Sequence, residues 1–446
     1  MLALVDANSF YCSAERVFRP DLNGRAVVVL SNNDGCVVSR SSEAKVLGVP
    51  MGAPWFQLRD RARRSHWDLT AFSSNYTLYG DMSRRFMNVL AQFVPPEDQS
   101  VYSIDESFLD FSKHTHLHPD ATALGHTIRD RVRVWTGLPV CVGFGGTQTL
   151  AKMANHIAKK QPRWMGVCDL TALSEPALHA LLSEVPVGDV WGIGRRLSAQ
   201  LIDGGIATAA DLRAADPKRL RERFSVVVER TVRELQGARC LGWETEPPAN
   251  KQIISSRSFG APLYTADDLM APVHAHAARA GEKARAQGSV AGRVGVWLTT
   301  NPFRPQDPQH TPARSVALPA PSADTAVLAA WSTALLRSIV RPGYRYVKAG
   351  VVLDDLRPHT EHQGSLFDAP RPGWAAQADR VPSRGEEWDA KRARVMEVLD
   401  TANAKWGSGH LGVGWSGIRA KQDWSMKRDM LSPCYTTDWN EVRAVS

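Results

Sequence analysis

The N-terminal third of the chain contains short apolar runs that end in acidic residues. Residues 2–5 read Leu-Ala-Leu-Val and predict a buried β-strand, which is followed at once by Asp6. Between residues 101 and 111, β-forming side chains lie on both sides of Asp105 and Glu106 and predict two antiparallel strands joined at these acids. Carboxylates at strand ends among Val, Ile and Phe are costly to bury without a cation. We therefore expect one sheet edge to gather all three acids.

A hairpin and a short capped helix are predicted between these acids. The β-forming runs at residues 26–30 and 36–38 flank Asn-Asn-Asp-Gly at residues 32–35, which indicates a hairpin with an Asp-Gly turn. Residues 41–48 begin with serine, continue with helix-forming residues and end in glycine, which is typical of a capped helix. Such a helix start offers free backbone N–H groups.

Helical periodicity dominates the middle of the chain. At residues 149–160, apolar side chains recur at helical spacing, which predicts a helix packed on the sheet with Lys152 and Lys159 away from its apolar stripe. Residues 167–240 carry further helical patterns interrupted by glycines and indicate a small helical domain.

The C-terminal half alternates strands, loops and a polar segment. Residues 251–298 suit a strand, a helix and a strand, and residues 347–353 suit a further buried strand. Residues 301–321 contain six prolines and are predicted to form a long irregular connection. Residues 354–384 are polar and show little periodicity, which indicates a linker. A mixed helical and irregular tail is expected up to residue 446, and no internal repeat is found.

The length, charge and cysteine content of the chain limit which classes of protein it can belong to. A chain of 446 residues predicts about two to four domains. The 54 Lys and Arg residues against 46 Asp and Glu residues give a net charge of +8, which weakly favours a polyanionic partner. The six cysteines indicate neither a disulfide framework nor a zinc site. No signal peptide and no run of ~18 apolar residues is found, so we expect a cytoplasmic protein.

Asp6, Asp105 and Glu106 are candidate metal ligands. Carboxylate oxygens are the ligands that Mg²⁺ prefers, and two such ions about 3.5–4 Å apart can hold both the attacking and the leaving oxygen of an in-line phosphoryl displacement. The alternative is three solvated turn acids, the commoner fate of a single Asp or Glu. Their apolar surroundings favour the metal site, and the sequence therefore predicts a protein that joins nucleotides.

A glycine-rich turn is a candidate DNA-binding element. Gly192 and Gly194 lie between two helical stretches and fit a helix-hairpin-helix, whose glycines let backbone N–H groups approach a phosphate. Arg195 and Arg196 follow directly and favour DNA binding over the alternative, a plain connector between helices.

Two smaller groups could contact a nucleotide. Ser42, Lys45 and Lys159 provide a hydroxyl and two ammonium groups that complement a triphosphate, although each alone is typical of a surface residue. Phe10 and Tyr11 follow Asp6 and are either core aromatics or rings that exclude a 2′-hydroxyl from a neighbouring sugar.

Five segments that include most of these residues together resemble the Y-family translesion DNA polymerases. They are Asp6–Tyr11, Ser31–Cys36, Tyr102–Glu106, Leu150–Asn155 and Val190–Gly194. A second set is similar to the bacterial UmuC branch of that family rather than the DinB branch, namely residues 31–35, 75–76, 229–235, 256–260 and 426–433. The resemblance extends over essentially the whole chain.

The resemblance implies an α+β multidomain fold arranged as a right hand. A ferredoxin-like palm would comprise residues 1–12 and 76–166, and small fingers residues 13–75. A helical thumb with the helix-hairpin-helix would span residues 167–240, an α/β little finger residues 245–355, and a linker with the C-terminal tail residues 356–446.

The resemblance also implies roles for single residues. Asp6, Asp105, Glu106 and the backbone carbonyl of Ala7 would ligate two Mg²⁺ ions. Tyr11, next to Phe10, aligns with the steric gate that discriminates between sugars. Ser42, Lys45 and Lys159 fall where the family contacts the incoming triphosphate, although other members often carry Tyr and Arg at the first two positions.

Residues 363–367 are similar to the family's sliding-clamp-binding peptide. Gln363, Leu366 and Phe367 would anchor it in a pocket of the clamp. The middle residues, Gly364 and Ser365, depart from the more usual Leu at the second place, which would weaken the contact.

The function implied is template-directed, error-prone DNA synthesis across lesions during the SOS response, without a proofreading exonuclease. Expected partners are primer-template DNA, dNTP, a processed UmuD-like dimer, RecA and the sliding clamp, in a nucleoid-associated cytoplasmic enzyme. Two alternatives remain: a palm-type nucleotidyl cyclase, which needs no DNA, and a non-catalytic DNA-binding scaffold.

Overall fold

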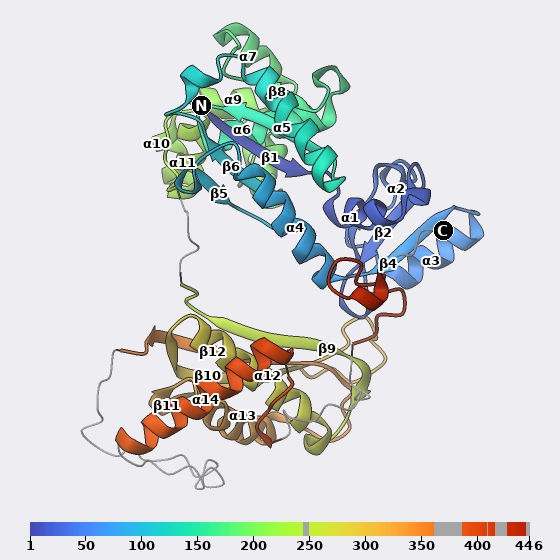
Figure 1. Cartoon of the computed structure of the whole chain (residues 1–446), viewed down its shortest axis with the longest axis vertical. Helices are drawn as coiled ribbons and strands as arrows, with labels where there is room; N and C mark the ends of the chain where they lie inside the picture. Colours follow the sequence, from blue (N-terminus) through green and yellow to red (C-terminus); the bar gives the residue numbers. More distant parts are fainter. Residues whose placement is uncertain (244–248, 361–385, 408, 415–425, 443–446) are drawn as a thin grey trace. The chain divides into compact units, whose positions relative to one another are not determined.

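The protein consists of two compact units, each described here by itself. The computed structural model (Figure 1) describes residues 1–243, 249–360, 386–407, 409–414 and 426–442. The first unit comprises Met1–Ser31, Gly35–Pro247 and Met430–Ser446, and the second comprises Asn32–Asp34 and Pro248–Asp429. The finer division into palm, fingers, thumb, little finger and tail stays a prediction.

A five-stranded sheet with the strand order β5-β6-β1-β7-β8 organises the first unit. The strands are β1 (Leu2–Ala7), β5 (Gln99–Val101), β6 (Glu106–Asp110), β7 (Val140–Gly145) and β8 (Val167–Asp169). The central strand β1 pairs antiparallel with both β6 and β7, and every residue of β1 is buried. The predicted buried strand at residues 2–5 is confirmed, and so is the antiparallel pair joined at Asp105 and Glu106.

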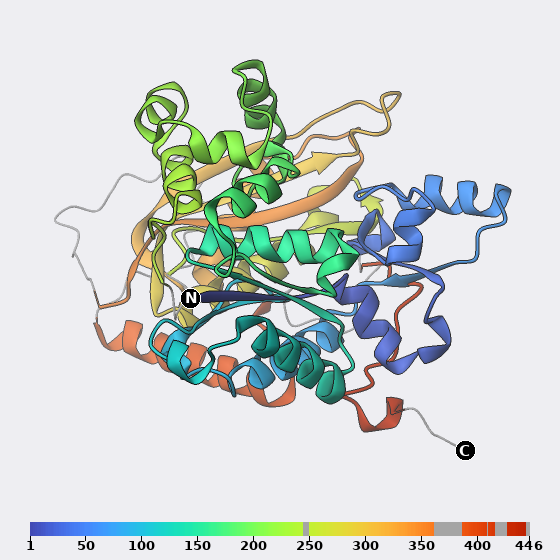
Figure 2. The same cartoon turned by 90° about the horizontal axis from the view of Figure 1, so that it is seen from above.

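Helices cover both faces of this sheet (Figure 2). On one face, α4 (Tyr76–Leu90) and α5 (Ala121–Thr136) pack against Ala3 and Val5 of β1. On the other face, α6 (Gln148–Lys160) packs through Ala151 against Leu2 and Leu4. The alternation of the β1 side chains between two apolar layers explains why its sequence is apolar throughout.

Helix α6 approaches the sheet closely because β7 has a glycine beneath it. A Cβ atom on Gly143 would lie 2.1 Å from the backbone N of Asn155. The Asn155 side chain donates hydrogen bonds from Nδ2 to the carbonyl oxygens of Leu4 (3.2 Å) and Cys141 (2.8 Å). These contacts fix α6 relative to the end of β1, and the predicted helix at residues 149–160 is confirmed.

A smaller sheet with the order β3-β2-β4 lies between β1 and α4 in sequence. Its strands are β2 (Ala26–Leu30), β3 (Val37–Arg40) and β4 (Leu69–Ser73), and its neighbouring helices are α1 (Phe10–Phe18), α2 (Ser42–Val46) and α3 (Trp55–Arg64). The antiparallel pairing of β2 with β3 confirms the hairpin. The Ser41 side chain accepts a hydrogen bond from the N–H of Ala44, which confirms the capped helix.

The predicted Asp-Gly turn of this hairpin is wrong in detail. The left-handed residues are Asn33 (φ 59°) and Asp34 (φ 50°), whereas Gly35 has φ −76°. The connection is a 3₁₀ segment, η2 (Asn32–Asp34), instead of a tight two-residue turn. Asn and Asp are the non-glycine residues that tolerate left-handed backbone best, because their short side chains bond locally.

Among the described residues of the first unit, five further α-helices confirm the predicted helical region. They are α7 (Glu175–Ser183), α8 (Arg195–Asp203), α9 (Ala209–Ala214), α10 (Pro217–Arg223) and α11 (Val226–Leu235). Their apolar side chains share a core with Leu150, Met153 and Ile157 of α6. The helical region is therefore anchored to the helix that also packs on the five-stranded sheet.

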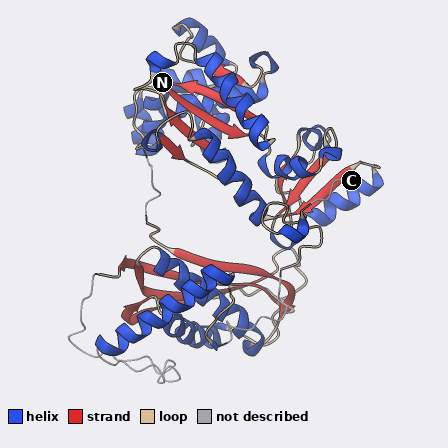
Figure 3. Ribbon diagram, in the orientation of Figure 1, coloured by secondary structure: helices blue, strands red, loops and turns tan. Residues whose placement is uncertain are grey.

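The second unit contains an antiparallel four-stranded sheet with the order β11-β10-β12-β9. Figure 3 colours the strands of the protein red and its helices blue. The strands are β9 (Ile253–Leu263), β10 (Ser289–Thr300), β11 (Ala313–Ser322) and β12 (Tyr346–Pro358). The helices are α12 (Ala266–Ala286), α13 (Thr325–Ile339) and α14 (Glu386–Trp406). Arg285 of α12 pairs with Asp400 of α14 at 2.7 Å.

Two predictions for this unit need correction. Residues 301–321 are not wholly irregular, because β11 begins at Ala313 and includes two of the six prolines. Strand β11 lies at the sheet edge, where a residue without an N–H is tolerated. The predicted linker also begins too early, because β12 continues through residues 354–358. The expected strand-helix-strand order at residues 251–298 is confirmed.

Two exclusions drawn from the sequence can be checked directly. All six cysteines lie in the described residues and are free, as predicted. Within the same described ranges, no helix combines the length and apolar character that crossing a bilayer requires.

Replacing Gly143 with alanine should destabilise the first unit. The new Cβ would collide with backbone atoms of α6, which cannot move aside as a flexible side chain could. We expect the free energy of unfolding to fall by about 3 kcal/mol, measured by urea unfolding of the whole chain. Gly146→Ala is the matched control, because a Cβ there meets nothing within 4 Å. Equal unfolding midpoints for the two variants would contradict the prediction.

Candidate active site

The strand pairing of the five-stranded sheet brings the three predicted acids together. Asp6 at the end of β1 lies opposite Glu106 at the start of β6, and the backbone N–H of Ala7 donates to the carbonyl oxygen of Asp105 at 2.9 Å. Asp6 is buried, whereas Asp105 and Glu106 are half-buried. The predicted convergence at one sheet edge is therefore confirmed, although the two segments are about a hundred residues apart.

Two lysines of α6 face these acids. The Nζ atom of Lys159 lies 2.5 Å from Oδ1 of Asp6, and that of Lys152 lies 2.7 Å from Oε2 of Glu106. The lysines are seven residues apart, so they lie on one face of the helix. The Lys152 ammonium also lies over the rings of Tyr102 (4.2 Å) and Trp191 (4.9 Å).

Burial and mutual repulsion disturb the titration of the acids. Burial raises the pKa of Asp6 to about 7, and the adjacent Glu106 contributes to this rise while Lys159 opposes it. Burial also raises the pKa of Asp105, against a hydrogen bond from Ser103. Burial acts in the same direction on Glu106, but hydrogen bonds from Asp6 and Lys152 outweigh it and lower the pKa of Glu106. Asp6 is thus the carboxyl that keeps a proton longest.

The donor chemistry of this site fits a hard divalent cation, but the side chains are held by other partners. In the part of the chain that the structure describes, no three His, Cys, Asp or Glu side chains are gathered tightly enough to hold an ion as they stand. Lysine ammonium groups hold Asp6 and Glu106, and the Ser103 hydroxyl donates to Oδ1 of Asp105 at 2.9 Å. The positive charge that the buried acids require is supplied here by lysine.

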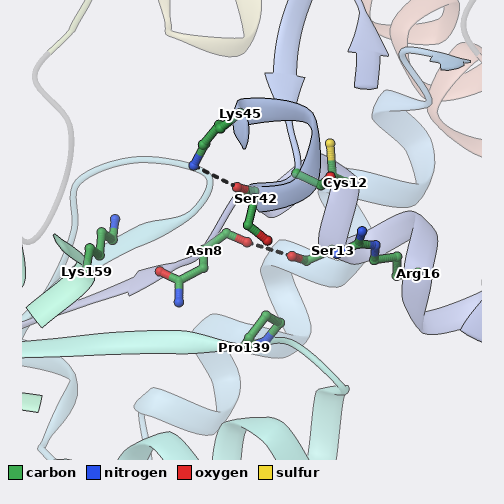
Figure 4. Close-up of a pocket in the computed structure, with 10 residues that line it drawn as sticks. Asn8, Cys12, Ser13, Arg16, Ser42, Lys45, Pro139 and Lys159 are labelled. Carbon is green, nitrogen blue, oxygen red and sulfur yellow. Dashed lines mark hydrogen bonds between the residues drawn. The ribbon is translucent and has the colours of Figure 1, made fainter. Parts of the chain in front are cut away.

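A polar cavity of about 360 Å³ adjoins the acids through Lys159, which lines it and pairs with Asp6. Figure 4 shows side chains that line this cavity. It is lined by Asn8, Ser9, Cys12, Ser13, Arg16, Ser41, Ser42, Lys45, Pro139 and Lys159. The predicted triphosphate contacts Ser42, Lys45 and Lys159 all line it. Lys159 also pairs with Asp6, so one ammonium group faces both the acids and the cavity.

The sequence interpretation missed the α1 side of this cavity. Arg16 of α1 pairs with Glu43 of α2 at 2.7 Å, and its Nε is buried without a hydrogen-bond partner in the described residues. Oδ1 of Asn8 is unpartnered in the same sense, and Ser13 donates to the Asn8 carbonyl oxygen at 2.6 Å. Nothing in the sequence pattern marks Arg16, because it becomes a cavity residue only when α1 packs beside α2.

The two aromatic residues after Asp6 have different surroundings. Phe10 is buried in the main apolar core, which is the packing role that the sequence left open for it. Tyr11 is half-buried, and its ring stacks on Tyr79 with a centroid distance of 4.4 Å. Burial raises the pKa of Tyr11, with further contributions from Tyr76 and Asp105, so the phenol lies near the acidic site.

The turn at residues 191–194 is present as predicted, but the element before it differs from the predicted helix. Gly192 has φ +87°, a conformation that side chains other than glycine rarely adopt, and Gly194 is the residue before α8. Arg195 and Arg196 are exposed at the start of α8. The element before the turn is a 3₁₀ segment, η6 (Val187–Asp189), and not an α-helix, because the chain ahead of it bonds to the segment before α9. DNA binding by this turn stays a prediction.

The remaining predicted site falls outside the described residues. Gln363, Leu366 and Phe367 of the clamp-binding peptide lie in residues 361–385. Contact with a sliding clamp therefore stays a prediction.

The fold and the sequence both have known relatives. A Dbh–Dpo4 chimera of a Y-family DNA polymerase aligns with a TM-score of 0.62 at 20% identity, covering 80% of this chain and 98% of the chimera. An insertion ternary complex of Dbh DNA polymerase aligns with a TM-score of 0.50 and covers 79% of this chain and 98% of that chain. The fold is that of the Y-family DNA polymerases, which confirms the predicted α+β multidomain class.

Sequence comparison narrows the family. Residues 5–156 match the impB/mucB/samB family, residues 250–366 its C-terminal domain, and residues 393–445 a domain of unknown function. Protein UmuC of Salmonella typhimurium is 44% identical over 100% of both chains, and Protein ImpB of that species is 42% identical over 99% of both. DNA polymerase IV of Brucella melitensis is 28% identical over 68% of this chain and 65% of its own length. The chain belongs to the impB/mucB/samB family, on its UmuC branch.

Removing the Lys159 charge should raise the pKa of Asp6 further. The ammonium group stabilises the ionised carboxylate, so Lys159→Met removes a contribution that lowers the pKa. We expect Asp6 to titrate near 7 in the metal-free parent and at higher pH in the variant, measured from the ¹³C shifts of labelled Asp carboxyls. Lys160→Met is the control, because Lys160 pairs with Asp189 instead. Titration of Asp6 at its ordinary value in all three proteins would refute this account.

Proposed function

We propose that the chain performs template-directed, error-prone DNA synthesis across damaged bases by nucleotidyl transfer with two divalent metal ions. The enzymatic class, a DNA-directed DNA polymerase, follows from its family. The observation that carries the proposal is the meeting of Asp6, Asp105 and Glu106 beside a cavity lined with cationic side chains.

In this proposal the acidic residues bind the metal ions, and the residues of the cavity bind the triphosphate. Two Mg²⁺ ions held by Asp6, Asp105, Glu106 and the carbonyl of Ala7 would neutralise phosphate charge and make the primer 3′-hydroxyl more acidic. Lys45 and Arg16 would bind the triphosphate through charge, and Ser42 through its hydroxyl. The primer 3′-hydroxyl would lose its proton to solvent as its oxygen forms a bond to the α-phosphorus. The bond from the α-phosphorus to the oxygen that bridges to the β-phosphate breaks, and pyrophosphate leaves in line.

The position of Lys159 suggests that metal binding at Asp6 precedes triphosphate binding in the cavity. Its ammonium group already balances the buried Asp6 carboxyl, and it also lines the cavity. A divalent cation held by Asp6 would supply this charge balance, and Lys159 would then be available to the triphosphate. The same exchange at Glu106 would free Lys152.

Tyr11 is the proposed sugar-discriminating side chain. Its ring is held by the stack on Tyr79 and lies next to the acidic site, where the sugar of an incoming nucleotide must sit. A planar ring in that place excludes a 2′-hydroxyl by volume. Low fidelity is proposed because α2 begins with the small, exposed Ser42, which offers little bulk over a nascent base pair. Ala44 of the same helix is buried in the core of the three-stranded sheet and takes no part in this proposal.

The biological setting belongs to the same proposal. We propose that the enzyme acts in the SOS response with primer-template DNA, dNTP, a processed UmuD-like dimer, RecA and the sliding clamp. The glycine turn at residues 191–194 and the exposed Arg195 and Arg196 support DNA as a partner. They speak against a nucleotidyl cyclase, which would not need them.

Replacing Asp105 with asparagine should abolish most nucleotide incorporation. Loss of one anionic ligand weakens the stabilisation of charge that develops on the phosphates, so we expect incorporation to fall by about 100-fold or more in a primer-extension assay. Asp110→Asn is the control, because Asp110 lies at the opposite end of β6 and pairs with Arg239. Undiminished extension by Asp105→Asn would favour a non-catalytic scaffold, and product formation without DNA would favour a cyclase.

Replacing Tyr11 with alanine should weaken sugar discrimination. The ratio of kcat/KM for dNTP to that for the matching rNTP is expected to fall about 10-fold or more, because the excluded volume beside the 2′ position is lost. Tyr11→Phe keeps the ring and should keep the ratio. An unchanged ratio in Tyr11→Ala would remove Tyr11 from this role.

A further inference from the structure

A short segment near the C-terminus belongs structurally to the first unit. This segment, Met430–Tyr435, lies within the part of the tail that packs with the N-terminal residues. The N–H of Ser73 donates to the Met430 carbonyl oxygen at 2.9 Å, and the N–H of Met430 donates to Oγ of Ser73 at 3.0 Å. The Met430 side chain packs on the core of the three-stranded sheet.

The other end of the segment is held by an aromatic stack. The rings of Tyr435 and Phe18 of α1 are stacked with a centroid distance of 4.7 Å and an interplanar angle of 10°. The segment therefore connects β4 with the end of α1, and Ser432 lies between these two anchors.

Ser432 enters a buried polar network. Nδ2 of Asn75 donates to the Ser432 carbonyl oxygen at 3.0 Å, while Oδ1 of Asn75 accepts from the N–H of Leu78 and caps α4. Oγ of Ser432 donates to Oε1 of Glu15 at 2.9 Å. Ser432 is 4% exposed and Glu15 is 0% exposed, so the network is closed to solvent.

The same carboxylate oxygen holds Tyr79. The Tyr79 hydroxyl donates to Oε1 of Glu15 at 2.7 Å. The Tyr79 ring in turn stacks on Tyr11 with an interplanar angle of 17°. Two hydrogen bonds and one ring stack thus connect Ser432 with Tyr11.

The hydrogen bonds among Ser432, Glu15 and Tyr79 are not needed merely to anchor the segment Met430–Tyr435. Oε2 of Glu15 is buried without a hydrogen-bond partner in the described residues, which is a costly state for a carboxyl group. The backbone bonds at Ser73 and the stack at Phe18 would already hold the segment. A buried acid that accepts from both Ser432 and Tyr79 has the additional effect of fixing the hydroxyl, and with it the ring plane, of Tyr79.

We propose that Ser432, Glu15 and Tyr79 are positioning residues for sugar selection, through which the C-terminal segment sets the orientation of the Tyr11 ring. The inference rests on the proposed role of Tyr11. Ser432 holds Glu15, Glu15 holds the Tyr79 hydroxyl, and the Tyr79 ring supports the face of Tyr11. Loss of either hydrogen bond lets the two rings tilt and admits a 2′-hydroxyl.

The test compares the dNTP-to-rNTP ratio of kcat/KM among matched variants of the full chain. Ser432→Ala should lower the ratio about 5-fold, the factor that corresponds to one net hydrogen bond. The loss should come from faster rNTP incorporation, with dNTP incorporation little changed. Ser432→Thr keeps the hydroxyl and should restore the ratio. Ser338→Ala is the control, because in the described part of the chain its hydroxyl donates to the Leu335 carbonyl oxygen of the same helix, α13.

A second variant separates positioning from simple stabilisation. Tyr79→Phe keeps the stack on Tyr11 but loses the bond to Glu15, and should lower the ratio as Ser432→Ala does. The double variant should show less than the sum of the two effects, because both act through one oxygen of Glu15.

The outcomes distinguish this inference from the proposed function. An unchanged ratio in Ser432→Ala and Tyr79→Phe, together with a reduced ratio in Tyr11→Ala, overturns the positioning role and leaves the polymerase proposal intact. A lower melting temperature with an unchanged ratio means that the segment is only an anchor, and also overturns it. An unchanged ratio in Tyr11→Ala removes Tyr11 from sugar selection, and it overturns the positioning role together with that part of the proposed function.

Discussion

The pairing of β1 with β6 brings the buried carboxyl group of Asp6 into contact with the half-buried carboxyl group of Glu106. Like charges at such a distance in a poorly hydrated place cannot both ionise without a compensating cation, and much of the surrounding structure supplies one. Helix α6 presents an ammonium group to each acid, and it does so because Gly143 lets its backbone settle directly on the sheet. The charge balance at the site therefore depends on a contact between backbones.

The cavity beside the acids is lined by further cationic side chains. Its cations come from three elements, with Arg16 on α1, Lys45 on α2 and Lys159 on α6. A cavity lined with cations and set beside a group of acids suits a ligand that carries both negative charge and metal ions. Because Lys159 lines the cavity and also pairs with Asp6, occupancy of the cavity affects the electrostatics of the acids.

The sequence predicts the elements that depend on local pattern and the meeting of the three acids, but it misses several other roles that arise where distant segments pack together. Strand β1, helix α6 and the Ser41 cap follow from periodicity and end signals, and the acids could be assigned because each ends an apolar run. Strand β11 was missed because its prolines are acceptable only at a sheet edge, and edge position is a tertiary property. Arg16 and Glu15 were missed for a related reason, since their roles arise from packing with α2 and with the C-terminal segment.

The buried partnership of Ser432 with Glu15 spans 417 positions along the chain. During synthesis on the ribosome, the N-terminal sheets emerge and begin to pack long before the serine exists, because chains are made from the N-terminus onward. Until then, among the described residues, the Tyr79 hydroxyl alone donates a hydrogen bond to the carboxyl of Glu15. A polypeptide released before Met430 would lack the second donor, so the polar network of the first unit requires translation to pass Ser432.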